Sequence, residues 1–273
     1  MPPRSPLHIT ANSLGDRSTL DPFLNGGAMS QVSTPLQPEV IYPDSDGKPM
    51  SDNTKQFRWI VLIQQNLAAM FAHDANVFVA GDLLWYSVEG DNKTRYAPDA
   101  MVIFGRPKKD RGSYQQWKEE NIAPQVVFEI LSPSNTQTEM NKKLLFYDRY
   151  GVEEYYLYDP DKNDLSGWLR QGDPSGIGEA ARLTVIDPIA NWVSPRLNIR
   201  FDLTDEMLQL LLPDGTPFTT LEQERQRAEQ ERQRAEQERQ RAEQERQRAE
   251  QERQRAEKLA EKLRELGVDP TEI

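Results

Sequence analysis

Two acidic residues interrupt runs that otherwise read as apolar strands. In VVFEIL, Glu129 shares a strand face with Val127 and Leu131, while the other face carries only Val, Phe and Ile side chains. A run that is apolar on both faces is typical of a buried strand. Asp99 stands in the same way in APDAMVIF, beside Ala97 and Met101. An ionised carboxylate there is costly unless a cation or hydrogen bonds compensate it.

A divalent cation held between the two strands would explain both acids at once, because Mg²⁺ prefers carboxylate and water oxygens. The alternative is that each acid pairs with a basic side chain, or lies at a strand end and reaches water. The spacing alone leaves both interpretations open. In either case Asp99 and Glu129 are the residues that the pattern marks for chemistry.

The elements that must position these acids follow from periodicity and turn formers. Apolar residues at helical spacing predict a first helix over about residues 52–73. Branched and aromatic residues predict core strands at 77–86, 95–104 and 125–131. The pattern then predicts a helix capped by SPSNT and ended by Gly151, followed by a strand at 153–160. Short antiparallel strands continue to about 203, and an amphipathic piece follows at 205–213.

The tail consists of one repeated heptad. EQERQRA occurs five times in succession from Glu222 to Ala256, and EKLAEKLREL continues the helical pattern. The heptad has Ala at one core position and Glu three residues on, whereas a strong coiled coil needs both positions apolar. Glu and Arg at helical spacing support a solvated single helix by about 0.2–0.5 kcal/mol per pair. A weak coil through Leu259, Leu263 and Leu266, or partial disorder, is the alternative.

Composition excludes several functional classes. The chain has 273 residues and a net charge of −11, and without residues 222–273, which hold 13 basic and 15 acidic side chains, the body keeps −9. An acidic body disfavours a tight nonspecific nucleic-acid binder but not a nuclease, because metal-binding acids contribute to that charge.

The absence of cysteine excludes thiolate catalysis and Cys-bound zinc. Two histidines and no glycine-rich phosphate loop leave little for a triad or a nucleotide site. No apolar run suits a membrane span or secretory signal, so the expected location is cytoplasmic.

Several motifs together resemble a known family. RYAPDAMVIFG, QVVFEILSPSN, KLLFYDRYGVEEYYLYDP and the later WVSPRL are similar, in this order, to the Uma-type putative restriction endonucleases of the PD-(D/E)XK nuclease superfamily. The resemblance covers about residues 40–212. It implies a restriction-endonuclease-like α/β fold, with a central mixed sheet flanked by helices, and a Mg²⁺-dependent DNA endonuclease in which Mn²⁺ could substitute.

The superfamily pattern is carried over residue by residue. Its Pro-Asp falls on Pro98 and Asp99, and its acid-X-Lys falls on Glu129, Ile130 and Leu131, so the lysine is missing. The resemblance implies that Lys143, on the following helix, replaces it, with a solvated helix lysine as the alternative. Asp99, Glu129 and the Ile130 backbone carbonyl would then hold the metal, and Lys143 would position the nucleophile.

Weaker candidates lie nearby. Asp52 is a tentative site acid from the first helix, or simply its N-cap, and Asp82 is a tentative outer-shell ligand, or a turn or bulge residue. The basic segment 106–111 is a candidate phosphate contact, or a solvated loop.

The expected organisation has four parts. They are a disordered or loosely ordered segment 1–40, a nuclease-like domain 41–218, a charged helix 219–267 and an end segment 268–273. DNA is the expected partner, as substrate. The competing functions are a noncatalytic nuclease-fold binding module and a homo-oligomeric scaffold assembled through the helical tail.

Overall fold

The computed structural model describes residues 40–47, 49–173, 180–204 and 206–266. Residues 1–39, for which the sequence predicts no fold, lie outside the described residues. The helices are α1 (Thr54–Met70), the 3₁₀ helix η1 (Gln116–Lys118), α2 (Gln137–Tyr150) and α3 (Leu221–Glu265). The strands are β1 (Val77–Ala80), β2 (Trp85–Tyr86), β3 (Arg95–Tyr96), β4 (Ala100–Phe104), β5 (Tyr114–Gln115), β6 (Val126–Ile130), β7 (Glu154–Asp159), β8 (Asp164–Gln171), β9 (Arg182–Val185), β10 (Arg200–Leu203) and β11 (Leu208–Leu211).

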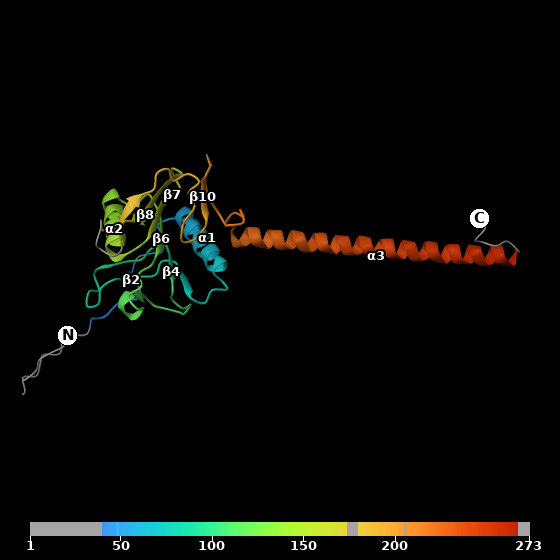
Figure 1. Cartoon of the computed structure of the whole chain (residues 1–273), viewed down its shortest axis with the longest axis horizontal. Helices are drawn as coiled ribbons and strands as arrows, with labels where there is room; N and C mark the ends of the chain where they lie inside the picture. The colour runs from blue at the N-terminus through green and yellow to red at the C-terminus, as the bar shows by residue number, and fades with distance from the viewer. Residues whose placement is uncertain (1–39, 48, 174–179, 205, 267–273) are drawn as a thin grey trace, which may run out of the picture. The chain divides into compact units, whose positions relative to one another are not determined.

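A mixed six-stranded sheet forms the centre of the domain, in the order β1-β4-β6-β7-β8-β9. Its neighbours are antiparallel except β6 and β7, which are parallel, with α2 as the crossover between them. Two small sheets join β3-β2-β5 and β10-β11. The predicted α/β fold, with a central mixed sheet and a long C-terminal helix, is confirmed (Figure 1).

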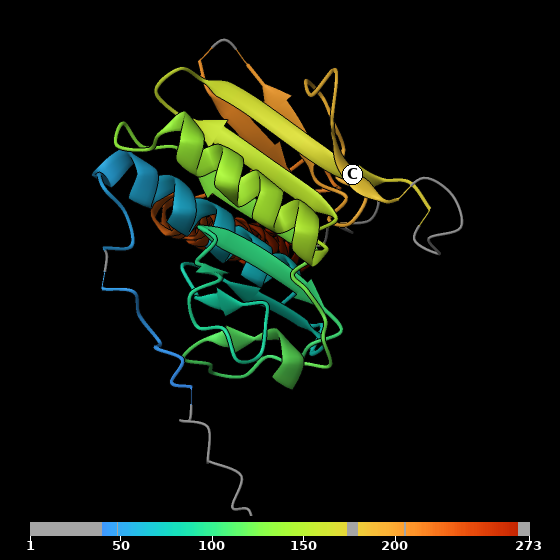
Figure 2. The ribbon, with the colours of Figure 1, turned by 90° about the vertical axis from the view of Figure 1, so that its left-hand side faces the viewer.

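The two faces of the sheet belong to different cores. On β6, Phe128 packs in the same core as Ile63 of α1, whereas Val127 packs with Phe146 of α2. Figure 2 shows both helices lying against the strands. All five residues of β6 are buried, so the prediction of a strand buried on both faces is confirmed.

Two predicted strands are each broken in two. The run 77–86 divides into β1 and β2 around Asp82, which has a φ of 47°, and the run 95–104 divides into β3 and β4 around Pro98. The Asp82 N–H donates to the Pro98 carbonyl at 3.0 Å, so the two breaks lie side by side. As a result β2 and β3 leave the central sheet and pair in a small sheet of their own. The amphipathic piece at 205–213 contains β11, which pairs with β10.

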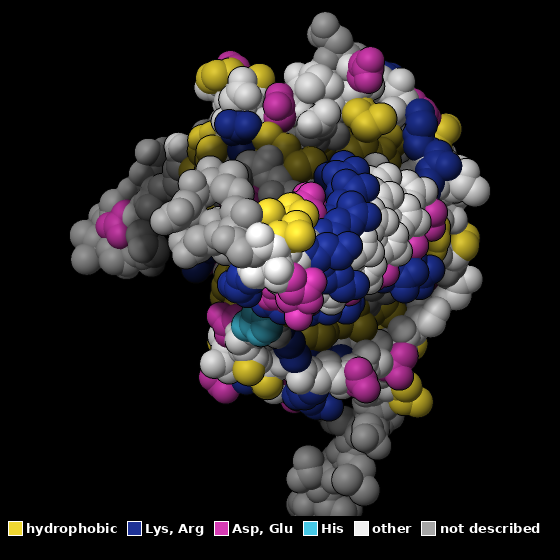
Figure 3. Space-filling view, turned by 90° about the vertical axis from the view of Figure 1, so that its right-hand side faces the viewer, with side chains coloured by type: hydrophobic (Ala, Val, Ile, Leu, Met, Phe, Trp, Pro, Cys, Tyr) yellow, Lys and Arg dark blue, Asp and Glu magenta, His cyan; other side chains and the backbone are white. Residues whose placement is uncertain are grey.

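The tail is one continuous helix, α3, with no buried residue. It begins with a capping box formed by Thr220 and Gln223. Four ion pairs along the repeat join a Glu to an Arg three residues on, as Glu229 does with Arg232 at 2.9 Å, and Arg253 also pairs with Glu257 four residues on. Figure 3 shows Lys and Arg side chains in a band along this helix. Among the residues that the structure describes, no helix is long and apolar enough to cross a membrane.

Candidate active site

The register of two neighbouring strands sets Asp99 beside Glu129. Ala100 of β4 pairs with Phe128 of β6, so the next position along the pair brings the two acids opposite each other. The Ile130 N–H donates to Asp99 Oδ2 at 2.6 Å. Both acids are buried, with 8% of Asp99 and 2% of Glu129 exposed. The structure therefore brings together the two carboxylates that the strand pattern marks.

Lys143 reaches Glu129 from the helix that follows β6. Its Nζ lies 2.8 Å from Glu129 Oε2, and only 13% of its side chain is exposed. The Tyr147 hydroxyl, one turn later on α2, donates to Glu129 Oε1. A spacing of four residues puts both side chains on one helix face. Glu129 thus has a protein donor on each oxygen, and Lys143 is not a solvated helix lysine.

Burial dominates the ionisation of this group. It raises the pKa of Asp99 well above its usual range, and the Glu129 charge adds to the rise, whereas Lys143 and the Ile130 N–H oppose it. Burial alone would lower the pKa of Lys143, but the attraction of Glu129 and Asp99 outweighs it and raises that pKa. Lys143 is therefore held as a cation. A second cation between the carboxylates would favour the ionised form of Asp99.

Gln56 of α1 links the first helix to the end of β6. Its Nε2 donates to the Ile130 carbonyl at 2.8 Å, and its Oε1 accepts from the Asp52 N–H at 2.8 Å. The side chain is buried. A carbonyl oxygen has two lone pairs, so the Ile130 carbonyl keeps acceptor capacity for a further partner. Gln56 thereby fixes the direction of the backbone group that the family resemblance names as a metal ligand.

Asp52 precedes α1 but is not its N-cap. That position belongs to Asn53, whose side chain accepts from the Gln56 N–H. Asp52 Oδ2 instead accepts from Ser132 Oγ at 2.5 Å and from Ser134 Oγ. Both serines lie in the loop after β6, so Asp52 ties the start of α1 to the end of the strand that carries Glu129.

Asp82 occupies the break between β1 and β2 rather than a strand. Its φ of 47° is left-handed, a conformation that Asp tolerates better than most residues. Burial raises its pKa, and the charges of Asp46 and Glu129 add to the rise. Asp82 is thus a turn residue whose carboxylate lies close enough to Glu129 on β6 for the two charges to interact.

Asp99 and Lys143, together with Asp52, Gln56 and Asp82, line a cavity of about 620 Å³, whereas Glu129 and Tyr147 do not belong to its lining. Its walls come from the segment before α1, from β3, from the loop after β6 and from α2; the charged lining residues are Asp46, Asp52, Asp82, Lys93, Arg95, Asp99, Glu139 and Lys143. In the described part of the chain, no three or more His, Cys, Asp or Glu side chains are grouped to hold a metal ion by themselves. A cation here would depend on two carboxylates, a carbonyl and water, which is a usual environment for Mg²⁺.

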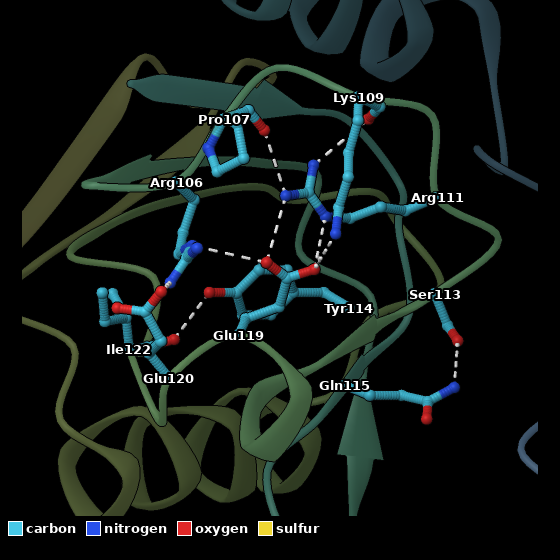
Figure 4. Close-up of polar contacts among 10 residues, drawn as sticks. All are labelled: Arg106, Pro107, Lys109, Arg111, Ser113, Tyr114, Gln115, Glu119, Glu120 and Ile122. Atoms are coloured by element: carbon cyan, nitrogen blue, oxygen red, sulfur yellow. Dashed lines mark hydrogen bonds and ion pairs between the residues drawn. The ribbon is translucent and has the colours of Figure 1, made fainter. Parts of the chain in front are cut away.

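The basic segment 106–111 does not offer a free phosphate contact. Figure 4 shows three of its side chains turned toward Glu119, whose carboxylate is buried. Arg111 Nε lies 2.9 Å, Lys109 Nζ 3.1 Å and Arg106 Nε 3.4 Å from Glu119 oxygens. Lys108 donates to backbone carbonyls at the end of α1. The segment is a loop with residues 107–110 exposed, so the solvated-loop interpretation holds there, while the buried Glu119 engages the charges of Arg106, Lys109 and Arg111.

Periodicity missed two residues of this site, Gln56 and Tyr147. Each lies on the buried face of its helix, where Gln56 is four residues before Ile60 and Tyr147 is seven residues after Met140. A hydrogen-bonding group at a buried helix position needs a hydrogen-bond partner. This requirement is the signal in the sequence that could have identified Gln56 and Tyr147.

Comparisons with known proteins identify a family and similar solved structures. The family model Uma2, described as "Putative restriction endonuclease", matches residues 38–201, a range that includes Asp99, Glu129 and Lys143. The crystal structure of a putative nuclease of DUF820 from Anabaena variabilis ATCC 29413 is similar at 20% identity, covering 54% of this chain and 74% of that chain with a TM-score of 0.39. No curated protein matches the chain.

Proposed function

This chain belongs to the Uma2 family of putative restriction endonucleases, and we propose that it is a Mg²⁺-dependent endonuclease that hydrolyses phosphodiester bonds in cytoplasmic DNA. The observation that carries the proposal is the buried pair of Asp99 and Glu129, with Lys143 Nζ 2.8 Å from Glu129. Two carboxylates on neighbouring strands, with a lysine ammonium from the following helix beside them, form a site suited to metal-assisted hydrolysis.

The ion would be held by Asp99, Glu129 and the backbone carbonyl of Ile130. The fit rests on donor chemistry, since these are hard oxygen donors brought together at the end of β6, which suits Mg²⁺ and also Mn²⁺. When bound, such an ion acidifies a water molecule and neutralises charge on the scissile phosphate. Asp82 and Asp52 are proposed as outer acids of the same cavity.

The remaining roles fall to the chain's own side chains. Lys143 supplies the positive charge that the superfamily pattern expects at Leu131, and its ammonium group positions the nucleophilic water and stabilises the developing anion. Tyr147 orients Glu129 through its hydroxyl, and Gln56 orients the Ile130 carbonyl. Tyr147 and Gln56 are positioning residues, because each acts through a group that would touch the ion.

Cleavage of supercoiled plasmid tests the proposal. We expect the wild-type chain to cut with Mg²⁺ or Mn²⁺ and to stop with EDTA. Asp99→Asn and Glu129→Gln should each lower the rate by at least about 100-fold with the circular dichroism spectrum unchanged. Asp110→Asn, at an exposed position outside the cavity, is the matched control. Undiminished cleavage by both site variants would sink the assignment.

A noncatalytic nuclease-fold module is the second candidate. It is favoured by one observation: both Glu129 oxygens are already engaged, by Lys143 and by Tyr147, as a purely structural network would require. Such a module would bind nucleic acid without cutting it. Binding of DNA with no cleavage in either metal would select this alternative, and metal-dependent cleavage by the wild-type chain would exclude it.

A further inference from the structure

We propose that Lys93 and Arg95 form a phosphate-binding subsite on the β3 wall of the cavity, which takes a nucleic-acid backbone phosphate next to the scissile one. This inference rests on the proposed nuclease function and names the group of the substrate that the cavity holds besides the reacting phosphate. Both residues line the same cavity as Asp99 and Lys143.

The charge of the cavity favours such a subsite. Five acids line it, namely Asp46, Asp52, Asp82, Asp99 and Glu139, against three bases. One of these bases, Lys143, is already paired with Glu129. A polyanionic backbone entering this cavity meets repulsion at long range unless fixed positive charge receives it. Lys93 and Arg95 are the remaining bases of the lining.

The fold uses most other bases of the domain but not these two. Arg106, Lys109 and Arg111 surround Glu119, and five further ion pairs hold Lys55, Lys162, Arg170, Arg182 and Arg196. Within the described ranges, neither Lys93 nor Arg95 takes part in an ion pair. Lys93 is exposed and Arg95 is half-buried. Their charges are therefore available to an anion that enters the cavity.

Both side chains are carried by an ordered turn. The Asp91 carboxylate accepts from the Lys93 N–H at 2.8 Å and from the Thr94 N–H at 3.1 Å. The Arg95 guanidinium donates to the Asn92 carbonyl and stands 5.7 Å from the centre of the Tyr86 ring. A guanidinium fixed in this way loses less conformational entropy when it binds a phosphate.

The chemistry of the pair indicates what it recognises. A guanidinium can donate two parallel hydrogen bonds to phosphate oxygens, and an ammonium adds a point charge. Contacts of this kind position the backbone and do not read its sequence. The expected ligand is thus a phosphodiester chain rather than a single nucleotide, and the subsite contributes to binding more than to the chemical step.

Fluorescence anisotropy of a labelled DNA oligonucleotide tests the subsite in the full chain. The background is Glu129→Gln, so that binding is read without cleavage. Adding Lys93→Gln should weaken DNA binding at least about tenfold and reduce the magnitude of the negative slope of log K against log salt by about 1. Adding both Lys93→Gln and Arg95→Gln should reduce the magnitude of this slope by about 2. Lys118→Gln, at an exposed position outside the cavity, is the matched control and should leave both quantities unchanged.

Lys93 is exposed, so its variant reads the subsite even if Arg95→Gln disturbs the contact with Tyr86. Unchanged affinity and salt slope in Lys93→Gln would overturn the subsite, as would a loss equal to that of the Lys118 control. Plasmid cleavage by the wild-type chain reports separately on the proposed function. In Lys93→Gln alone, with Glu129 intact, KM should rise while kcat changes little.

Discussion

Lys143 Nζ lies 2.8 Å from Glu129 Oε2, so the helix after the strand supplies the positive charge that the strand itself lacks. In the superfamily pattern that charge comes from the residue two positions after the acid, which here is Leu131. Because the lysine is on α2 and not on the strand, β6 carries only apolar side chains apart from Glu129. The position of the lysine also places the ammonium beside Glu129, the proposed metal ligand, so the lysine and the proposed ion would share one carboxylate.

Because Lys143 and the proposed ion would share the Glu129 carboxylate, removing the lysine should affect cleavage and metal affinity differently. Lys143→Met should lower cleavage at least about 100-fold, because the group proposed to stabilise the developing anion is lost. The same change frees Glu129 Oε2 from its ion pair, so Mn²⁺ affinity measured by calorimetry should stay equal or increase. Lys142→Met, at the exposed neighbouring position, is the control and should alter neither quantity. A loss of Mn²⁺ binding in Lys143→Met would contradict the shared-carboxylate interpretation.

The acid pair also carries a cost in stability. Asp99 and Glu129 are both buried and face each other, and Lys143 offsets only part of their repulsion. Asp99→Asn keeps an oxygen that accepts from the Ile130 N–H but removes one charge. The unfolding free energy in EDTA should therefore rise by about 1 kcal/mol while cleavage is lost. Urea unfolding measures this, and a variant less stable than wild type would show that the carboxylate is a structural requirement.

Local patterns were sufficient to predict the strand and helix that carry this site. Side chains alternate along a strand, so an acid in a run apolar on both faces is conspicuous, as Glu129 is in β6. Lys143 follows from helical spacing on α2 together with the family resemblance. Gly151, with a φ of 93°, ends that helix where the sequence predicts, because glycine adopts this conformation without strain.

Long-range contacts could not be predicted in the same way. Gln56 bonds the Ile130 carbonyl across 74 residues of sequence, and neither flanking pattern indicates the other. The sequence leaves the basic run 106–111 open between a phosphate contact and a solvated loop, because its partner, Glu119, is recognisable only once the loop path is known. The sequence does not show the strand break at Pro98 and leaves Asp82 open between a ligand and a turn or bulge residue, because the two breaks lie side by side only in the folded sheet.

Gln56 offers a test of positioning. Gln56→Leu leaves the Ile130 carbonyl and the Asp52 N–H without their side-chain partner, which should lower the unfolding free energy by about 1–3 kcal/mol. Cleavage should fall about 10- to 100-fold, as for other outer partners of metal ligands. Titration of Mn²⁺ should show weaker binding, which a purely structural role would not cause. Gln65→Leu, on the exposed face of α1, is the matched control.

Glu119 should make the fold sensitive to acid. The hydrogen bond from Arg111 is the main cause of its lowered pKa, with Lys109 adding to it. A carboxyl group whose pKa is lower in the folded state stabilises the fold above its ordinary pKa, and this contribution is lost as pH falls through the folded value. Glu119→Gln should cost about 3 kcal/mol at pH 7, because the buried Arg111 side chain loses its carboxylate partner and keeps only the Lys109 and Pro107 carbonyls. Urea unfolding at several pH values should show the two curves converging below the ordinary pKa of Glu, and a constant gap would contradict the assignment.

The repeat helix should be dispensable for the stability of the body. None of its residues is buried, and its ion pairs join residues within the helix, as Glu243 and Arg246 do at 3.2 Å. Deleting residues 229–256 in frame joins Ala228 to Glu257 and preserves the heptad phase. The urea midpoint and the cleavage rate should then stay unchanged, while the helical signal at 222 nm falls.

The repeat helix should also not drive self-association, because its core heptad positions alternate Ala with Glu. The full chain and a chain truncated after Ala228 should therefore sediment with the same number of subunits. A larger assembly that disappears on truncation would instead assign Leu259, Leu263 and Leu266 to self-association.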